Sequence, residues 1–389
     1  MGFTRSDFDP ALYWRITEDG EILLVHTYVD DMMVVSVCER DETVTVAGLR
    51  RVFTMTDMEF PDMFVGVDVE KSGGGSEPLI YYLHQATFIA KTIRDLDIDP
   101  ATLLSTLLPM SNDHAISPEL DETLYLDKKS HELYRSLVGS LLYISTCTRP
   151  DVSYAVNILC RYSLHPGKKH MLLAKQVLRY LHGTSRMGLR YSSAEPLEIM
   201  AYADSDYASC TVTRRSTTGY AFMVAGAAVS WNCKRQHTVA VSSMEAEYQA
   251  AGAAARDGTW LQRLLMELSH TFKPLDLKGD NTACALLAKN HMVTDRSKHI
   301  DVVYHFVREK VENGDMTVTQ IATVDNTADI FTKPLKKDLF LKHRNGLGLV
   351  LVPTKAGAGG VGGATVGANV PPVMMKRKKR KAKTSERAV

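Results

Sequence analysis

The chain has 389 residues, of which 45% are hydrophobic and 23% are charged, and its formal net charge is +1. This composition is ordinary for a globular protein of two or three domains. The longest apolar runs are far shorter than a membrane span, and Arg5, Asp7 and Asp9 interrupt the start of the chain where a secretory signal would be apolar. We therefore expect no membrane partner.

The six cysteines are widely scattered and include no Cys-x-x-Cys pair, so the sequence indicates neither a zinc site nor a disulfide framework. A reducing intracellular compartment is the expected location. Charge is distributed unevenly, because residues 376–389 hold eight Lys or Arg and one Glu and thus carry +7, which leaves −6 on residues 1–375. Nucleic-acid binding by the folded part would therefore depend on local patches and on metal ions.

The end of the chain has a composition of its own. Residues 356–368 are mostly Gly, Ala and Val without charge, so we expect residues 346–389 to be a disordered tail. A basic block follows, formed by Lys376, Arg377, Lys378, Lys379, Arg380 and Lys381. Such a block is typical of a nuclear localisation signal or of a sequence-independent nucleic-acid tether, and the alternative is a charged chain end that no partner recognises. The expected location is cytoplasmic, and nuclear if the block acts as a signal.

Periodicity predicts the elements in chain order. Apolar, β-branched runs at 22–28 and 32–37 flank Asp30 and Asp31 and predict a hairpin. Residues 131–182 have apolar positions at helical spacing, and the stretch 192–196 indicates a linker. The last region predicts a strand at 197–203, one or two strands within 219–231, a strand at 238–241, a helix at 243–268, a strand at 275–279, helices at 283–289 and 299–313, a strand at 317–322 and a short helix near 327. This order predicts an α/β (mixed α+β) fold, with a mixed sheet flanked by helices.

Four acids lie at the ends of these predicted elements. Asp204 follows the first strand of the last region, Glu247 lies in the opening turns of the long helix, Asp280 ends the next strand, and Asp329 lies on the final short helix. Carboxylates in such places can converge although they are far apart in the sequence. Oxygen ligands of this kind suit Mg²⁺. Two such ions, about 3.5–4 Å apart, activate a water and stabilise the leaving oxygen of a phosphodiester. Ordinary surface acids are the alternative.

Six segments of the last region together carry a specific resemblance. They are Ala201-Tyr-Ala-Asp-Ser-Asp-Tyr-Ala208, Arg215-Ser-Thr-Thr-Gly-Tyr220, Ser242-Ser-Met-Glu-Ala-Glu-Tyr248, Asp280-Asn281, Ser297-Lys-His-Ile-Asp301 and Ala328-Asp-Ile-Phe-Thr-Lys-Pro-Leu335. Over residues 199–335 the chain resembles the ribonuclease H domain of copia-type retrotransposons. The resemblance implies a ribonuclease H-like mixed five-stranded sheet with flanking helices. It also implies that Asp204, Glu247, Asp280 and Asp329 bind two Mg²⁺ ions, for which Mn²⁺ substitutes.

Two neighbouring acids compete with this assignment. Glu245 stands three residues after Ser242, at capping-box spacing, which favours a structural role at the start of the helix. Asp206 is more consistent with a turn residue or with a residue that supports the metal ligands. Asp204, in contrast, matches the first acid of the family. Arg214, Arg215 and Lys298 are expected either to contact the phosphates of a hybrid duplex or to be solvated surface residues.

Residues 1–190 resemble the rear part of a copia-type reverse transcriptase. The matching segments include Tyr28-Val-Asp-Asp31, Tyr134-Arg-Ser-Leu-Val-Gly-Ser-Leu-Leu-Tyr143 and Thr148-Arg-Pro-Asp-Val152. The resemblance implies that Asp30 and Asp31 hold polymerase metals, but the third aspartate and the fingers of the family lie upstream of this hairpin. We therefore expect a partial palm at 1–100, a thumb- or connection-like helical region at 101–192, a ribonuclease H domain at 196–345 and a tail at 346–389, without autonomous DNA synthesis.

The leading hypothesis is an endoribonuclease that cuts the RNA strand of RNA–DNA hybrids by two-metal hydrolysis, attached to an incomplete RNA-directed DNA polymerase. Its expected partners are the hybrid and the rest of a Pol polyprotein. The alternative is a decayed or co-opted nucleic-acid-binding fragment of such an element.

Overall fold

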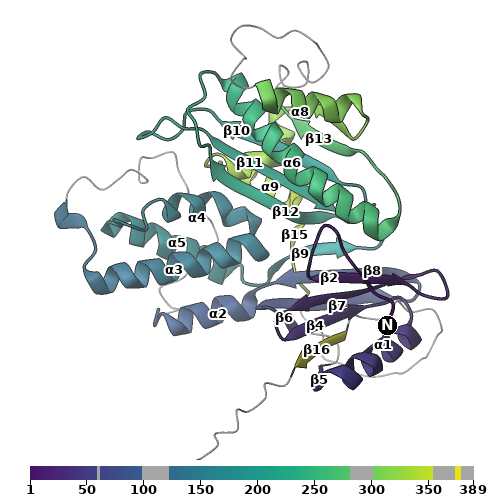
Figure 1. Ribbon diagram of the computed structural model, residues 1–389. Helices are drawn as coiled ribbons and strands as arrows, with labels where there is room; N and C mark the ends of the chain where they lie inside the picture. Colours follow the sequence, from purple (N-terminus) through teal and green to yellow (C-terminus); the bar gives the residue numbers. More distant parts are fainter. Residues whose placement is uncertain (59–61, 99–121, 281–300, 354–372, 378–389) are drawn as a thin grey trace, which may run out of the picture.

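The computed structural model describes residues 1–58, 62–98, 122–280, 301–353 and 373–377, which form three β-sheets with helices between and around them (Figure 1). No helix in these ranges has the length and apolar character that crossing a bilayer requires. The predicted helix at 283–289 and the predicted contact Lys298 lie outside the described residues.

The first sheet is fully antiparallel, and its strand order is β1-β2-β3-β4-β16-β5. Its strands are β1 (Thr4–Arg5), β2 (Leu12–Ile16), β3 (Ile22–Tyr28), β4 (Asp31–Val35), β5 (Met55–Met58) and β16 (Val373–Arg377), and α1 (Glu39–Val52) links β4 to β5. The predicted hairpin is present as β3 and β4. Alternation places Leu23, Val25 and Val34 in a small core of their own.

The second sheet is also antiparallel and joins segments that are far apart in the sequence. Its order is β15-β9-β8-β7-β6, with β6 (Met63–Phe64), β7 (Val67–Gly74), β8 (Glu77–His84), β9 (Met187–Ser192) and β15 (Leu349–Leu351). The expectation of disorder from residue 346 is therefore wrong for its first residues, because β15 pairs with β9 and Leu349 is buried. Residues 373–377 of the expected tail form β16, where the backbone of Lys376 pairs with that of Asp31.

The helices between the sheets form a layer with its own apolar core. They are α2 (Ala86–Asp95), α3 (Lys128–Cys147), α4 (Ser153–Cys160) and α5 (Lys168–Gly183), with the short turns η2 (Glu122–Leu124) and η3 (Pro150–Val152). This core continues into the third sheet, since the indole of Trp231 donates to the carbonyl of Ser145 at 2.8 Å and the amide of Asn157 donates to that of Cys233 at 2.8 Å. The helical region and the last region are thus packed on each other directly.

The third sheet is mixed, as the sequence predicted, and has five strands in the order β12-β11-β10-β13-β14. They are β10 (Met200–Asp206), β11 (Thr217–Val224), β12 (Ala227–Arg235), β13 (Leu275–Gly279) and β14 (Met316–Gln320). The first three strands are antiparallel, and β13 and β14 run parallel to β10. Three meandering strands followed by two parallel crossovers are the topology of a ribonuclease H-like fold, so the predicted fold class is confirmed.

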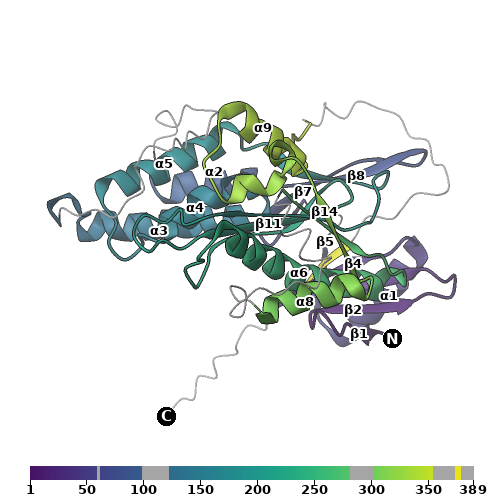
Figure 2. The ribbon, with the colours of Figure 1, turned by 90° about the horizontal axis from the view of Figure 1, so that it is seen from above.

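Helices cover both faces of this sheet (Figures 1 and 2). The helices α6 (Ser243–Ser269) and α8 (Asp301–Glu312) lie on one face, and α4, the turn η6 (Thr327–Phe331) and α9 (Lys337–Gly346) lie on the other, with the turn η5 (Thr323–Asp325) leading into η6. Gly258 lets α6 approach closely, because a Cβ there would lie 2.5 Å from Leu275 Cδ2 and 2.8 Å from Phe222 Cε1. This packing sets the distance between α6 and the strands β11 and β13.

Two details of the sequence prediction are wrong. The segment 238–241 is a loop before α6, with Val239 50% and Val241 70% exposed, although its valines favour a strand. The first strand of the last region extends to Asp206, so Asp204 lies within β10 and does not follow it. The span 219–231 resolves into the two strands β11 and β12.

Candidate active site

Three carboxylates meet where parallel strands and the long helix come together. Asp204 lies in β10 and is 2% exposed, and Asp280 directly follows β13, the parallel neighbour of β10. Glu247 lies in the second turn of α6, which packs across both strands. One carboxylate oxygen from each of the three acids lies within 4.8 Å of the others, which is the spacing of a metal-binding group.

The fourth acid, Asp329, reaches the site through an anchored turn on the opposite face of the sheet. Asn326 caps η6, accepts from the backbone N–H of Ala328 at 3.2 Å, and donates from its side-chain amide to the carbonyl of Ala203 at 2.9 Å. These bonds tie η6 to the residue next to Asp204. The hydroxyl of Thr332, which directly follows η6, donates to Asp204 Oδ2 and so joins this turn to the carboxylate on β10.

Gly219 makes this approach possible. It is the register partner of Asp204 on β11. A Cβ at this position would lie 2.6 Å from Phe331 Cβ, 2.7 Å from Thr332 Cγ2 and 3.1 Å from the carbonyl oxygen of Ala328. Only a residue without a side chain therefore lets η6 pack this closely onto β11.

Lys333 is a site residue that the sequence analysis missed. Its Nζ lies 3.0 Å from Asp329 Oδ1 and 3.7 Å from Asp204 Oδ2. Burial opposes its charge, but attraction to Asp204 and Asp329 raises its pKa above the ordinary value for lysine. A signal was present in the sequence, because Lys333 stands four residues after Asp329 within the last of the matching segments.

The acids repel one another in a poorly solvated place. Burial, followed by the charges of Asp204 and Asp280, raises the pKa of Glu247 to about 9. Burial and the charge of Asp204 raise the pKa of Asp329 to about 7, and burial also raises the pKa of Asp204. Lys333 supplies one positive charge to this group, so a multivalent cation would relieve the remaining repulsion.

The two competing acids have other partners. Glu245 Oε2 accepts from the backbone N–H of Val241 at 2.7 Å, and Ser242 Oγ accepts from the N–H of Glu245 at 3.1 Å, so this pair closes the start of α6. Asp206 lies two residues beyond Asp204 on β10, where burial raises its pKa and Ser209 hydrogen-bonds to it. Neither acid belongs to the group of three converging carboxylates.

The other predicted site residues lie elsewhere. Arg214 and Arg215 are in the loop between β10 and β11, where Arg214 is exposed and has a left-handed φ of 54°. Asp30 and Asp31 lie at the tip of the β3–β4 hairpin, beside Val29, which has a φ of 53° that is rare for a β-branched residue. Among the described residues, no further His, Cys, Asp or Glu joins this pair in a metal-binding group. Of the basic block, Lys376 and Arg377 lie in β16, and Lys378, Lys379, Arg380 and Lys381 lie outside the described residues.

The chain is similar to several transposon proteins over most of its length. It is 33% identical over 340 residues to the retrovirus-related Pol polyprotein from transposon TNT 1-94 of Nicotiana tabacum, covering 87% of this chain and 25% of that protein. It is 32% identical over 360 residues to the corresponding polyprotein from transposon RE1 of Arabidopsis thaliana, covering 91% of this chain and 23% of that protein. The chain thus spans about a quarter of the length of these two relatives.

A shorter relative is matched over most of its own length. The transposon Ty5-1 protein of Saccharomyces cerevisiae is 33% identical over 252 residues, which are 64% of this chain and 78% of that protein. No protein-family model matches the chain.

Solved structures that are similar to part of the chain include ribonucleases H. One is RNase H1 from Halobacterium salinarum, with 17% identity, a TM-score of 0.27, and coverage of 35% of this chain and 94% of that one. Another is LC11-RNase H1 in complex with an RNA/DNA hybrid, with 16% identity, a TM-score of 0.28 and the same two coverages.

Proposed function

Because this chain belongs to the Pol polyproteins of copia-type retrotransposons, we propose that its last folded region is a metal-dependent ribonuclease H that cuts the RNA strand of RNA–DNA hybrids. The observation that carries the proposal is the convergence of Asp204, Glu247 and Asp280 within 4.8 Å of one another on a ribonuclease H-like sheet. Similarity to relatives does not by itself locate the chemistry, whereas this group of converging carboxylate oxygens does.

The donor set fits divalent metal ions. All of its atoms are carboxylate oxygens, which Mg²⁺ and Mn²⁺ prefer over nitrogen or sulfur. Burial and mutual repulsion raise the pKa values of Asp204, Glu247 and Asp329, so the site favours cations that pair with several acids at once. Asp204, Glu247, Asp280 and Asp329 would hold two ions, which when bound would activate a water and stabilise the departing oxygen of a phosphodiester.

The surrounding residues hold these acids in place. Thr332 orients Asp204 by donating to its Oδ2, and Asn326 fixes the turn that carries Asp329. Lys333 partly neutralises Asp204 and Asp329, which keeps the carboxylates together before any metal binds. The hybrid is the proposed substrate because the RNA 2′-hydroxyls distinguish the strand that is cut.

We propose no autonomous DNA polymerase activity for the first sheet. Asp30 and Asp31 are positioned by the β3–β4 hairpin, but no third acid accompanies them among the described residues. The hairpin and the helices that follow it are proposed to position duplex for the nuclease. The alternative function is binding without cleavage, and a folded protein that binds hybrid without cutting it would favour that alternative.

The test is cleavage of a hybrid labelled on its RNA strand by the full chain in Mg²⁺, beside the Asp280→Asn variant. RNA cleavage that requires the metal and disappears in the variant is the expected result. A folded, monodisperse wild-type protein that cuts in neither Mg²⁺ nor Mn²⁺ would overturn the proposal. The labelled DNA strand, and the same sequence as a DNA duplex, serve as controls for strand and substrate preference.

A further inference from the structure

A groove lies beside α6 where the sheet extends past the helix. The helix packs on β10, β11 and β13, so the face of the edge strand β12 that points toward α6 is left open. The resulting hollow has a volume of about 620 Å³. Its walls come from one face of β11 and β12, from the loop before α6, and from a stripe of α6 formed by Glu245, Gln249, Ala253 and Arg256.

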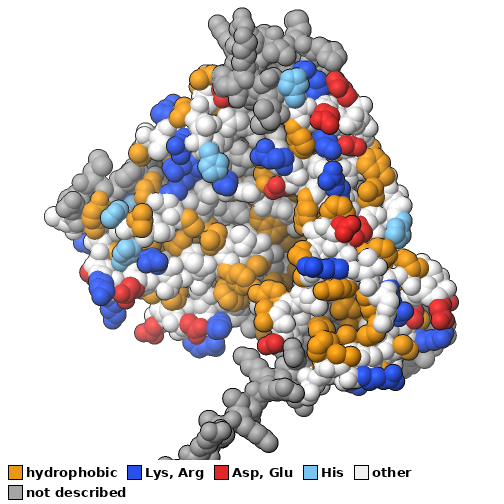
Figure 3. All heavy atoms as spheres, viewed as in Figure 1, with side chains coloured by type: hydrophobic (Ala, Val, Ile, Leu, Met, Phe, Trp, Pro, Cys, Tyr) orange, Lys and Arg blue, Asp and Glu red, His pale blue; other side chains and the backbone are white. Residues whose placement is uncertain are grey.

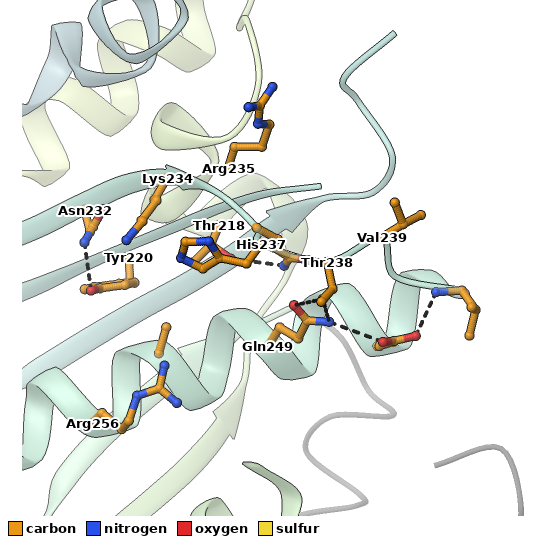
Figure 4. Close-up of a pocket in the computed structure, with 14 residues that line it drawn as sticks. Thr218, Tyr220, Asn232, Lys234, Arg235, His237, Thr238, Val239, Gln249 and Arg256 are labelled. Carbon is orange, nitrogen blue, oxygen red and sulfur yellow. Dashed lines mark hydrogen bonds between the residues drawn. The ribbon is translucent and has the colours of Figure 1, made fainter. Parts of the chain in front are cut away.

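Two cations face each other across this groove. Lys234 on β12 and Arg256 on α6 both point into the space between strand and helix, whereas the next residue, Arg235, points to the opposite side of the strand (Figure 4). Lys234 and Arg256 are exposed, and neither forms an ion pair with any residue that the structure describes. Figure 3 shows further Lys and Arg side chains on the face of the molecule that carries α6.

The floor of the groove is polar, and most of its polar groups have hydrogen-bond partners. The Tyr220 hydroxyl donates to Asp257 and accepts from the amide of Asn232 at 3.0 Å, so Asp257 is engaged with tyrosine. Gln236 is 6% exposed, and its amide donates to Thr218 Oγ1 at 3.1 Å and to the carbonyl of Ala246 at 2.9 Å. Its Oε1 has no hydrogen-bond partner, so one buried acceptor at this floor is left open.

The groove starts beside the carboxylate group. Thr218, which lines it, is next to Gly219, the register partner of Asp204, and Glu245 precedes Glu247 on α6 by two residues. The groove and the carboxylates therefore lie on two sides of the first turns of the same helix. A duplex that presented one phosphate to the acids would place neighbouring phosphates near these turns, because the phosphates of one strand follow each other about every 3.4 Å along the helix axis.

We propose that this groove is a second anion-binding site, which holds the sugar–phosphate backbone of the duplex away from the bond that is cut, with Lys234 and Arg256 as the phosphate contacts. The two cations supply the charge that a phosphate needs, and the open Gln236 Oε1 accepts from a sugar hydroxyl. The inference rests on the proposed function, since it assigns the same nucleic acid to both sites. The chain as a whole has a net charge of only +1, so local cations of this kind must provide the attraction.

The test is the salt dependence of hybrid binding, measured by fluorescence anisotropy in EDTA on full-length Asp280→Asn protein. Each phosphate contact contributes a slope of roughly 0.9 to the plot of log affinity against log salt, so adding Lys234→Ala and Arg256→Ala should lower the slope by about 1.8. The matched control removes two exposed cations outside the groove, by Lys168→Ala and Arg263→Ala, and should leave the slope unchanged.

Equal slopes for the groove variant and its parent would overturn the proposal. An equally large decrease of the slope in the control variant would also overturn it, because that would show a dependence on net charge alone. The four cations replaced in the groove variant and in the control are exposed, and matching thermal unfolding curves would show that the variants remain folded. Because no cleavage is measured, this result is independent of whether the carboxylates cut RNA, and a chain that binds through the groove without cutting would separate the two proposals.

Discussion

Gly219→Ala is the substitution that most directly tests how the two faces of the sheet are joined at the site. The added methyl group would lie 2.6 Å from Phe331 Cβ and 2.7 Å from Thr332 Cγ2, whereas carbon atoms at rest lie about 3.5–4.0 Å apart. The neighbours on η6 must therefore move by about 1 Å. Overpacking of this kind costs about 1–3 kcal/mol, which corresponds to a loss of roughly 2–4 °C in Tm for each kcal/mol in a domain of 150–250 residues.

The same movement should reduce catalysis. Asp329 and Thr332 both lie on the displaced segment, and a misplacement of about 1 Å at a catalytic centre can cost roughly 100-fold in rate. The assays are thermal unfolding and the rate of hybrid cleavage in saturating Mg²⁺. Gly139→Ala is the control, because Gly139 lies in α3 with nothing within 4 Å of an added Cβ and should gain about 0.5–1 kcal/mol. Wild-type stability and rate in Gly219→Ala would refute the packing argument.

Three further predictions concern the acids, the cation beside them and the contact between the first sheet and α6. The pKa of Asp329 is raised from 3.8 to about 7 and that of Glu247 from 4.5 to about 9, so the folded state binds more protons than the unfolded state between these values. The metal-free protein should therefore lose stability as pH rises from the ordinary values to the raised ones, and Mg²⁺ should restore it; unfolding temperatures that do not change with pH would contradict this. Lys333→Met removes the positive charge that partly neutralises the acids, so at pH 8 the metal-free variant should unfold at a lower temperature than wild type. Its unfolding temperature should also rise more on addition of Mg²⁺, and an equal rise in both proteins would count against the role of Lys333. Glu267 on α6 accepts a hydrogen bond from Ser6 Oγ at 2.5 Å, so Glu267→Ala should speed amide hydrogen exchange in residues 4–16 while hybrid cleavage is retained. Unchanged exchange would show that this contact does not anchor the segment.

The sequence predicted the fold of the last region because its signals are local. The stripe of apolar residues on α6, the cap at Ser242 and the alternation along β10 each depend on neighbours within a few positions. The acids proposed for the site could also be selected from the sequence, since Asp204 and Glu247 stand in distinctive short segments. The loop at 238–241 was misassigned because β-branched valines favour strands wherever they occur, and only the tertiary structure shows that no neighbouring strand is present to pair with them.

Features that depend on contacts between distant segments could not be predicted. The role of Gly219 follows from the position of η6, which is about a hundred residues away in the sequence. Lys234 and Arg256 belong to a strand and a helix whose separation is set by how Gly258 packs on the sheet. Pairing of β15 with β9 likewise joins two segments that look unrelated in sequence. Periodicity identifies the elements, but it does not specify the distances between them.

The measurement that tests the central claim most directly compares Glu247→Gln with Glu245→Gln in metal-dependent cleavage of an RNA–DNA hybrid. The two acids are two residues apart on α6, but only Glu247 belongs to the converging carboxylates, whereas Glu245 accepts from the N–H of Val241. Glu247→Gln should abolish cleavage in a folded protein, and Glu245→Gln should keep it with reduced stability. Full activity in Glu247→Gln, or loss of activity only in Glu245→Gln, would contradict the assignment of this site.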